Sequence, residues 1–386
     1  MRIAIDYTSA IVQGAGIGRY TRNLVAALAQ LDSGDRYTLF STEAPTAERP
    51  IPRAPTFRAR VVPVGNRRAT ILWHRLRVPM PAELVTGRAD VLHGPDFTLP
   101  PTIGARTVVT IHDLAFLTHP ECALPSLVAY LSRVVPHALH RADRVIAVSQ
   151  RTATDLIERL NVPAERIAVI HLGVDPSFAH TPADDAVAEA CARLGLATPF
   201  VLTVGTIEPR KNYERLIAAF ARIAREAAGP RMLVIAGRKG WLYEGVFAAA
   251  QRHGVAEQVR FLDYVTDGDL RALYRAAAVL AMPSLYEGFG IPLLEAMASG
   301  TPIVCSTAGS LPEVAADAGL LVPAEDTDAL AEALLRVVRE PALAAALVAR
   351  GRERVKAFTW RAAAQAHLRV YHEAAKQTWQ PGGQTS

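Results

Sequence analysis

Residues 278–295 read AVLAMPSLYEGFGIPLLE, and they contain one complete strand–loop–helix unit. The apolar run before Pro283 is typical of a buried strand. Pro292 is placed to start a helix, because the N–H that proline lacks has no partner in the first helical turn. Backbone N–H groups around Gly290 and Ile291 would then point at an anion, which the helix dipole favours.

Similar units recur on both sides of this stretch. In the first half we predict strands in RIAID, RYTLF, ADVLHG, TVVTIHD, RVIAVS and RIAVIHLG, with helices such as GRYTRNLVAALAQL and SQRTATDLIERL. In the second half we predict strands in FVLTVGT, RMLVIAG, QVRFLDYV, AVLAMPS and PIVCST, separated by the helices RLIAAFARIA, DLRALYRAA, IPLLEAMAS and DALAEALLRVVRE. Alternation of apolar strands with helices predicts parallel sheets that are covered on both faces.

The 386 residues are too many for one ordinary core. A polar stretch, DPSFAHTPADDA, separates the two runs, and we place a linker at roughly 172–198. We therefore predict an α/β protein with two doubly wound, Rossmann-like domains, 1–175 and 198–358, that face an interdomain cleft. The last helix, 360–377, is expected to pack back on the first domain, and the tail PGGQTS is expected to be disordered. Ligands of such sheets bind at the carboxyl ends of the strands, which makes the cleft the expected site.

Composition and cysteine usage exclude several classes of protein. Apolar residues make up 50% of the chain and charged residues 20%, as in globular proteins, and no stretch approaches the ~20 apolar residues of a membrane span. The start, MRIAIDYT, predicts a first strand rather than a signal peptide. Cys122, Cys191 and Cys305 are widely spaced and match no metal-ligand pattern, so we expect a reducing cytoplasm and neither a disulfide framework nor a metal site.

The net charge of +5 suits phosphate ligands, anionic lipid and nucleic acid alike, and does not choose among them. One basic and aromatic cluster stands out within residues 67–77: Arg67, Arg68, Trp73, His74, Arg75 and Arg77. Two interpretations stay open. The cluster could make a peripheral contact with an anionic membrane surface, or it could be a solvated helix face with Trp73 turned inward.

Two motifs of the first half lie where ligands are expected. The loop QGAGIGR, residues 13–19, has three glycines before a helix and could present backbone N–H groups to a phosphate. It begins about seven residues beyond the strand, too late for a dinucleotide fingerprint, and a plain turn stays open. In TIHD, His112 ends a strand and could hydrogen-bond a sugar or be structural. Asp113 could fix the histidine tautomer or cap the next helix.

Two motifs of the second half carry charge. In GTIEPRKN, residues 205–212, Arg210 suits bidentate phosphate contact and Lys211 adds a compact charge, unless both are merely solvated. Glu287 lies in the loop before Pro292, and Glu295 follows about one turn into the helix. Both carboxylates could project into one site and accept hydrogen bonds from hydroxyls, and the apolar neighbours of Glu295 suggest partial burial. The following AGSLPE loop could add a contact.

Together these segments resemble the retaining, nucleotide-sugar-dependent glycosyltransferases of group 1, or family 4. The resemblance covers nearly the whole chain and rests on the glycine-rich loop, TIHD, ADRVIAVSQ, EPRKN, AGSLPE, and two glutamates, Glu287 and Glu295, with seven residues between them. It implies a GT-B fold with an acceptor domain followed by a donor domain, no cofactor and no metal.

The resemblance also implies roles for single residues. Glu287 would contact hydroxyls of the donor sugar, and Glu295 the ribose. Arg210 and Lys211 would hold the diphosphate, and His112 would lie against the sugar near the reacting carbon. The expected catalytic set is His112, Glu287, Arg210 and Lys211. Further donor contacts are expected at Gly16, Phe289, Gly290, Ile291 and Leu293.

One departure concerns Thr206, which stands where many relatives carry an arginine. Arg210 is expected to take over that charge, which leaves the division of labour between Arg210 and Lys211 open. The family retains anomeric configuration, which suggests front-face attack in which the departing phosphate takes the acceptor's proton. We find no nucleophile pair that favours a covalent intermediate.

The segments EPRKN and TIHDLAF resemble bacterial mannosyltransferases of surface-polysaccharide and lipid-glycan assembly. We therefore expect transfer of mannose from GDP-mannose to a glycan or lipid-linked glycan, with a UDP-sugar as the alternative donor. An NAD-dependent oxidoreductase and a non-catalytic sugar-nucleotide-binding module are less favoured. We expect a cytoplasmic protein that binds no nucleic acid, with a peripheral position on the inner face of the cell membrane left open.

Overall fold

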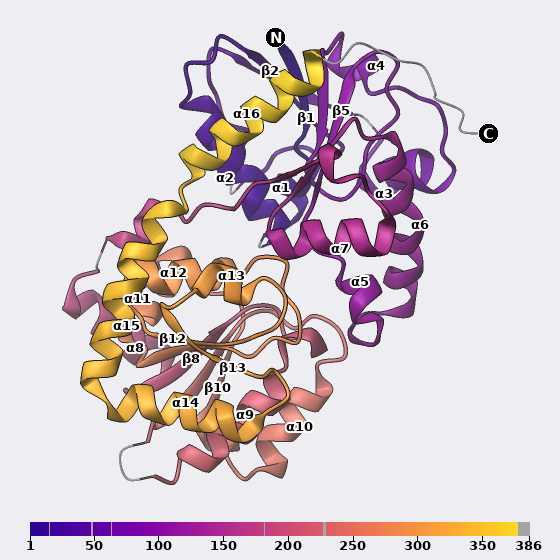
Figure 1. The fold of residues 1–386 in the computed structure, drawn as a ribbon. Coiled ribbons are helices and arrows are strands. Elements are labelled where there is room, and N and C mark those ends of the chain that lie inside the picture. The colour runs from indigo at the N-terminus through magenta and orange to yellow at the C-terminus, as the bar shows by residue number, and fades with distance from the viewer. Residues whose placement is uncertain (15, 48, 63, 181, 227–228, 377–386) are drawn as a thin grey trace.

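The computed structural model describes residues 1–376 except 15, 48, 63, 181 and 227–228, and it contains two parallel β-sheets in two lobes (Figure 1). One sheet has seven strands in the order β3-β2-β1-β4-β5-β6-β7, and the other has six in the order β10-β9-β8-β11-β12-β13. Helices cover both faces of each sheet (Figure 1). The predicted α/β fold with two doubly wound sheets is confirmed.

The strands of the first sheet are β1 Arg2–Asp6, β2 Arg36–Ser41, β3 Phe57–Val61, β4 Val91–Gly94, β5 Arg106–Ile111, β6 Arg144–Ala147 and β7 Ile167–Val169. The strands of the second sheet are β8 Phe200–Val204, β9 Met232–Ala236, β10 Val259–Leu262, β11 Val279–Met282, β12 Ile303–Ser306 and β13 Gly319–Val322.

The helices around the first sheet are α1 Thr8–Val12, α2 Ile17–Ala29, α3 Asn66–Ala69, the π-helical η1 Thr70–Arg75, α4 Glu83–Thr86, α5 Ala115–Thr118, α6 Pro125–Arg141, α7 Gln150–Leu160 and α16 Trp360–Lys376. The α-helices of the second lobe are α8 Asp184–Leu194, α9 Tyr213–Ile223, α10 Glu244–Arg252, α11 Asp267–Ala276, α12 Ile291–Ser299, α13 Leu311–Ala315, α14 Thr327–Arg339 and α15 Pro341–Arg354. Short 3₁₀ turns are η2 Pro120–Cys122, η3 Ala164–Arg166, η4 Pro176–Ala179, η5 Pro209–Lys211, η6 Ala256–Gln258 and η7 Val355–Ala357.

Several elements were not predicted, among them the helices α10 and α15, and two strands and a further helix are informative. The edge strand β3, FRARV, alternates charged with apolar residues and is mostly exposed, so it lacks the apolar run by which the other strands were predicted. The short strand β13 ends the second sheet. Helix α8 lies within the stretch expected to be a linker, and it packs against α11 of the second lobe. Each sheet lies within one of the segments 1–175 and 198–358, which we propose as the two domains.

The order of the strands places a crevice in each sheet. In the first sheet the chain runs outward from β1 to β2 and β3 and then returns to β4 on the other side of β1. In the second sheet the same reversal occurs between β8 and β11. Ligands of open α/β sheets bind at the carboxyl ends of strands beside such reversals. The fold therefore offers one ligand position in each lobe.

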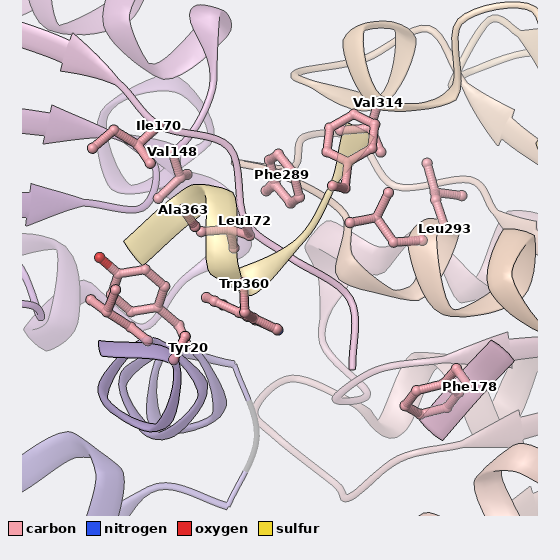
Figure 2. Close-up of a cluster of buried hydrophobic side chains, with 14 of the residues drawn as sticks. Tyr20, Val148, Ile170, Leu172, Phe178, Phe289, Leu293, Val314, Trp360 and Ala363 are labelled. Carbon is pink, nitrogen blue, oxygen red and sulfur yellow. The ribbon is translucent and has the colours of Figure 1, made fainter. Parts of the chain in front are cut away.

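An apolar junction joins the two lobes where the chain crosses between them. Val174 and Thr359, on the two crossing segments, form a parallel bridge. Figure 2 shows Trp360 and Leu172 at this crossing, with Phe289 of the second lobe close by. A single cluster of buried side chains contains these aromatic and aliphatic residues from both lobes. The lobes therefore share part of their core.

The C-terminal helix α16 lies along the first lobe beside α2 (Figure 1), as expected for residues 360–377; Gln377 and the tail PGGQTS lie outside the described residues. Buried hydrogen bonds fix it there. The hydroxyl of Tyr371 is hydrogen-bonded to His93 Nδ1, and that of Tyr20 to His367 Nε2, both at 2.8 Å. His93 Nε2 is in turn bonded to Thr110 on β5.

We expect Tyr371→Phe to lower the free energy of unfolding by about 1–3 kcal/mol, because it leaves the buried His93 Nδ1 without its partner. Guanidinium chloride unfolding followed by circular dichroism would measure the change. Tyr264→Phe is the matched control, because this tyrosine is 62% exposed. Equal unfolding free energies for Tyr371→Phe and the unmodified protein would contradict the proposed anchoring of α16.

Candidate active site

Arg210, Lys211 and Glu287 meet at the crevice of the second sheet, where β8 and β11 end. Lys211 Nζ donates to Glu287 Oε1 at 2.7 Å, and Arg210 Nη1 donates to Glu287 Oε2 at 3.0 Å. Two further residues complete the cluster. Ser284 donates to Glu287 Oε1 at 2.6 Å, and Glu208 accepts from Arg210 Nη2 at 2.6 Å. Two cations and two carboxylates thus balance each other.

Burial and charge together fix the ionisation of Glu287, which is 6% exposed. Burial raises the pKa of its carboxyl, but Lys211 and Arg210 outweigh burial and lower that pKa to about 2. Glu287 is therefore an anion at neutral pH. A carboxylate has about four lone-pair positions, and the cluster uses three, so Glu287 can still accept a hydrogen bond from a hydroxyl.

The two cations are held differently. The guanidinium of Arg210 donates to Glu208, Glu287 and the carbonyl of Tyr286, which uses three of its five N–H groups. Within the described residues the ammonium of Lys211 donates only to Glu287, which leaves two of its three protons for a ligand. Arg210 therefore mainly connects the two loops, and Lys211 keeps the larger share of its N–H groups free to bind a ligand.

The loop after β11 approaches the first lobe closely. A Cβ added at Gly288 would lie 1.9 Å from the carbonyl oxygen of His112, so only glycine allows this approach. Gly290 has φ 104° and is the N-cap of α12, which starts one residue before Pro292, in agreement with the predicted Pro-started helix. The first N–H groups of a helix have no intrahelical partner. A helix end with free N–H groups, which could bind an anion, therefore lies in the same loop as Glu287.

Phe289 and Leu293 offer only their backbone to a ligand, because both side chains point into the apolar junction (Figure 2). The AGSLPE loop packs against the backbone of the Glu287 loop. Ser310 donates its hydroxyl hydrogen bond to the carbonyls of Glu287 and Phe289, and Gly309 lies so close that an added Cβ would be 2.4 Å from Glu287 O.

Glu295 lies apart from this cluster and is 2% exposed. Its carboxylate accepts a hydrogen bond from the hydroxyl of Tyr274 at 2.8 Å and forms an ion pair with Arg19 Nη1 at 2.8 Å. Burial raises the pKa of Glu295, and Arg19 opposes that rise. In the described part of the chain Glu295 touches none of Arg210, Lys211 and Glu287. Three of the four predicted charged residues are thus brought together, and the fourth is paired with the first lobe.

Arg19 is a site residue that sequence reasoning missed. It lies in the first turn of α2, and its guanidinium lies 5.4 Å from the ring centroid of Phe178 while it pairs with Glu295. Its position in QGAGIGR, directly after the third glycine, was the available signal. Gly16 is the N-cap of α2 with φ 55°, and Gly18 is required because an added Cβ would lie 2.1 Å from Gln13 O.

His112 directly follows β5, lies against the Gly288 loop of the second lobe, and is 9% exposed. Its Nε2 is hydrogen-bonded to the carbonyl of Pro95 at 2.8 Å, so Nε2 carries the proton. Burial lowers the pKa of His112 to about 4, which makes the ring neutral at pH 7. It can therefore polarise or contact a sugar but supplies no charge. Asp113 accepts from Ala115 N and so caps α5.

Other contacts hold the lobes together across the cleft. The hydroxyl of Tyr286 donates to Asp155 on α7 at 2.5 Å. Glu313 accepts from the backbone N–H of Gln150 at 2.8 Å and is bonded to His171 at 2.6 Å. These contacts place the second-lobe loops against the N-terminus of α7 (Figure 1).

The basic cluster at residues 67–77 lies on α3 and η1. Trp73 is buried and donates its Nε1–H to Met80 O, which agrees with the interpretation in which this ring turns inward. The exposed side chains of the segment are Arg67, Arg68, Arg75, Leu76 and Arg77. No helix in the described residues has the length and apolar composition to cross a bilayer.

The cysteines at 122, 191 and 305 are free and buried.

Comparisons with known proteins identify the family of the chain. The model described as "Glycosyltransferase Family 4" matches residues 14–178, and that described as "Glycosyl transferases group 1" matches residues 193–354. The chain is 32% identical to O-antigen chain mannosyltransferase B of Escherichia coli over 356 residues, covering 89% of this chain and 92% of that protein.

Solved structures share the architecture. Sucrose-phosphate synthase from Thermosynechococcus elongatus superimposes with a TM-score of 0.76 at 25% identity, over 97% of this chain and 98% of that chain. Anabaena Alr3699/HepE in complex with UDP-glucose gives a TM-score of 0.71 at 18% identity, over 97% and 98% of the two chains.

The two parallel sheets, together with the superposition on a solved sucrose-phosphate synthase and the two matching family models, define a GT-B glycosyltransferase. The relatives specify the class further. The chain belongs to the group 1 glycosyltransferases, family 4, and has a bacterial O-antigen mannosyltransferase among its relatives.

We expect Gly288→Ala to reduce glycosyl transfer by about 100-fold, because the added methyl group would push the Glu287 loop away from His112 by the order of 1 Å. Steady-state kinetics would measure the loss. Gly104→Ala is the control, because its added Cβ meets nothing within 4 Å. A Gly288→Ala protein with normal kcat/KM would show that the two loops need not approach each other during catalysis.

Proposed function

We propose that this protein transfers mannose from GDP-mannose to a glycan or lipid-linked glycan and retains the anomeric configuration. The observation that carries the proposal is the cluster of Lys211, Arg210 and Glu287 beside the start of α12. The mannosyltransferase relative, which aligns over most of both chains, supports the sugar and the acceptor class.

The proposed chemistry follows from charge. Breaking the bond between sugar and diphosphate develops positive charge on the ring and negative charge on the leaving group. Lys211 and the first N–H groups of α12 would stabilise the leaving diphosphate, and Arg210 would add charge while it holds Glu287 in place. Glu287, an anion at neutral pH, would accept hydrogen bonds from donor-sugar hydroxyls. Glu295 would do the same for the ribose, beside Arg19.

We infer front-face attack, in which the departing phosphate takes the acceptor's proton and the new bond forms on the face that the phosphate leaves. The neutral His112, whose Nε2 proton is committed to Pro95 O, would contact the sugar without acting as an acid. The close approach of the lobes would keep water from the donor. A UDP-sugar is the second candidate donor, and the UDP-glucose complex of HepE supports it.

The exposed arginines of residues 67–77, together with Leu76, which is 65% exposed, support a peripheral contact with an anionic membrane. Such a contact would bring the first lobe close to a lipid-linked acceptor. The inward position of Trp73 means that this contact would rest on charge and on Leu76 rather than on an aromatic anchor.

We expect GDP-mannose to raise the melting temperature most in a panel of GDP-, UDP- and ADP-sugars. A ligand at 100 times its dissociation constant stabilises by about 2.7 kcal/mol, which such a scan detects. If only UDP-sugars raised the melting temperature, the donor would be a UDP-sugar, the second candidate, and not GDP-mannose. A panel without any response would contradict the proposed donor class.

We expect Lys211→Ala and Glu287→Gln to stay folded but to lose about 100- to 1000-fold in the rate of transfer, because each removes a group aimed at developing charge or at the donor sugar. Nucleotide release would measure the rate, and circular dichroism the fold. Lys356→Ala, at an exposed surface pair, is the control. Near-normal rates in both variants would show that the site has been assigned to the wrong residues.

We expect transfer to proceed at the same rate after treatment with EDTA, because we propose that Lys211, Arg210 and the helix end replace a metal at the diphosphate. Groups of three or more His, Cys, Asp or Glu able to hold a metal are absent from the described residues. A rate lost with EDTA and restored by Mg²⁺ or Mn²⁺ would overturn the metal-independent mechanism.

A further inference from the structure

A polar hollow of about 180 Å³ opens at the crevice of the first sheet, between the carboxyl ends of β1 and β4. Asp6 ends β1, and Asp96 follows β4 by two residues. The helices α3, η1 and α6 form its other walls. Polar side chains that line it are Thr8, Ser9, Gln13, Thr42, Asn66, Thr70, His74, Thr98 and Tyr130. The hollow is severalfold larger than one water molecule needs.

This hollow adjoins the proposed reaction centre. Pro95 lines it, and the carbonyl of Pro95 is the partner of His112 Nε2 at 2.8 Å. Phe97 also lines it, with its ring centroid 5.6 Å from that of His112. His112 in turn touches the loop that carries Glu287. A ligand in the hollow would therefore lie on the first-lobe side of the donor sugar.

The carboxylates of Asp6 and Asp96 are each held by a hydrogen bond and can accept more. Asp6 Oδ1 accepts from Thr8 N at 2.9 Å, and Asp96 Oδ2 accepts from Gln13 Nε2 at 2.9 Å. Asp96 Oδ1 has no hydrogen-bond partner within the described residues. Burial raises the pKa of Asp96 to about 6, because the buried carboxylate is poorly solvated. A hydrogen bond from a ligand hydroxyl would therefore stabilise the carboxylate.

The charge of the lining selects among ligands. Among the described residues that line the hollow, none is Lys or Arg. Burial lowers the pKa of His74 to about 4, so this ring adds no positive charge at neutral pH. The guanidinium of Arg75, which does not line the hollow, lies over the ring of Tyr130, 5.9 Å from its centroid. A phosphate in the hollow would thus face two acidic side chains and no lining cation.

We propose that this hollow binds one uncharged, polyhydroxylated ring of the acceptor, whose hydroxyls donate to Asp6 and Asp96, and that it excludes phosphorylated rings. The assignment rests on the proposed function, because it takes the ligand to be the acceptor of that transfer. It adds a subsite, two named ligand-binding carboxylates and a preference for neutral acceptors.

Ligand-observed saturation-transfer NMR tests the proposal with methyl α-D-mannopyranoside and its 6-phosphate as probes. The full chain would first be saturated with the 2-fluoro analogue of the donor that the thermal panel identifies, which fills the donor position. We expect the neutral probe to bind, and its 6-phosphate to bind at least about 10-fold more weakly, because a hydrogen bond to a charged group is lost and repulsion is added.

Two variants locate the binding. Asp96→Asn is expected to lower the affinity for the neutral probe by about 10- to 100-fold. Thr70→Phe is expected to abolish binding of the probe, because the phenyl ring would fill the hollow from η1. Asp90→Asn is the matched control, because Asp90 lies at the opposite end of β4, where it pairs with Arg2 at the surface. Binding of the donor analogue, measured in parallel, is expected to be unchanged in all three and reports correct folding.

Retention of full probe affinity by both Asp96→Asn and Thr70→Phe would overturn the proposal. So would a neutral probe that fails to bind the unmodified protein, or a 6-phosphate that binds as tightly as the neutral probe. Failure of the proposed function has a different signature, because the protein would then bind no nucleotide sugar in the thermal panel, whatever the probes do.

Discussion

The pairing of Glu287 with Lys211 and Arg210 is the interaction on which the rest of the site depends. A buried carboxylate without partners would be protonated or costly to fold. Here it bridges the loop after β8 and the loop after β11, and Arg210 extends the bridge to Glu208 and to the carbonyl of Tyr286. With both loops fixed, Gly288 can press against His112, and α12 can point its first N–H groups at the cleft.

The two lobes share one strand topology but place different charged groups at their crevices. Each sheet reverses its strand order beside the strand that begins it, β1 in the first and β8 in the second. The second-lobe crevice holds Arg210 and Lys211, balanced by Glu208 and Glu287, beside a helix end, and in our proposal the Lys211 protons left free suit a diphosphate. The first-lobe crevice holds Asp6 and Asp96, which suit hydroxyls. In our proposal this asymmetry separates the charged donor from the neutral acceptor, because two like crevices would compete for the same ligand.

The sequence pattern predicted the features that depend on neighbouring residues in the chain, namely the buried strands and the charged residues that follow them. The central strands are buried on both faces and so read as apolar runs, and Arg210, Lys211 and Glu287 follow strands that are neighbours in the sheet. The pattern missed β3, where an exposed edge allows FRARV to alternate, and α8, where the surroundings looked like a linker. It also missed the pairing of Arg19 with Glu295 and the approach of Gly288 to His112. Both depend on how the lobes sit together, which no local window contains.

The Arg19–Glu295 pair gives the lobe arrangement a chemical consequence. Glu295 belongs to the second lobe, yet the cation that compensates it comes from α2 of the first. A ribose hydroxyl can share the carboxylate with Arg19, since each oxygen has two lone pairs. If the lobes moved apart, Glu295 would keep Tyr274 but lose Arg19, the cation that opposes the rise of its pKa by burial. In our proposal, Glu295 therefore recognises the nucleotide in the arrangement in which Arg19 reaches it, and in that same arrangement Gly288 lies against the carbonyl of His112.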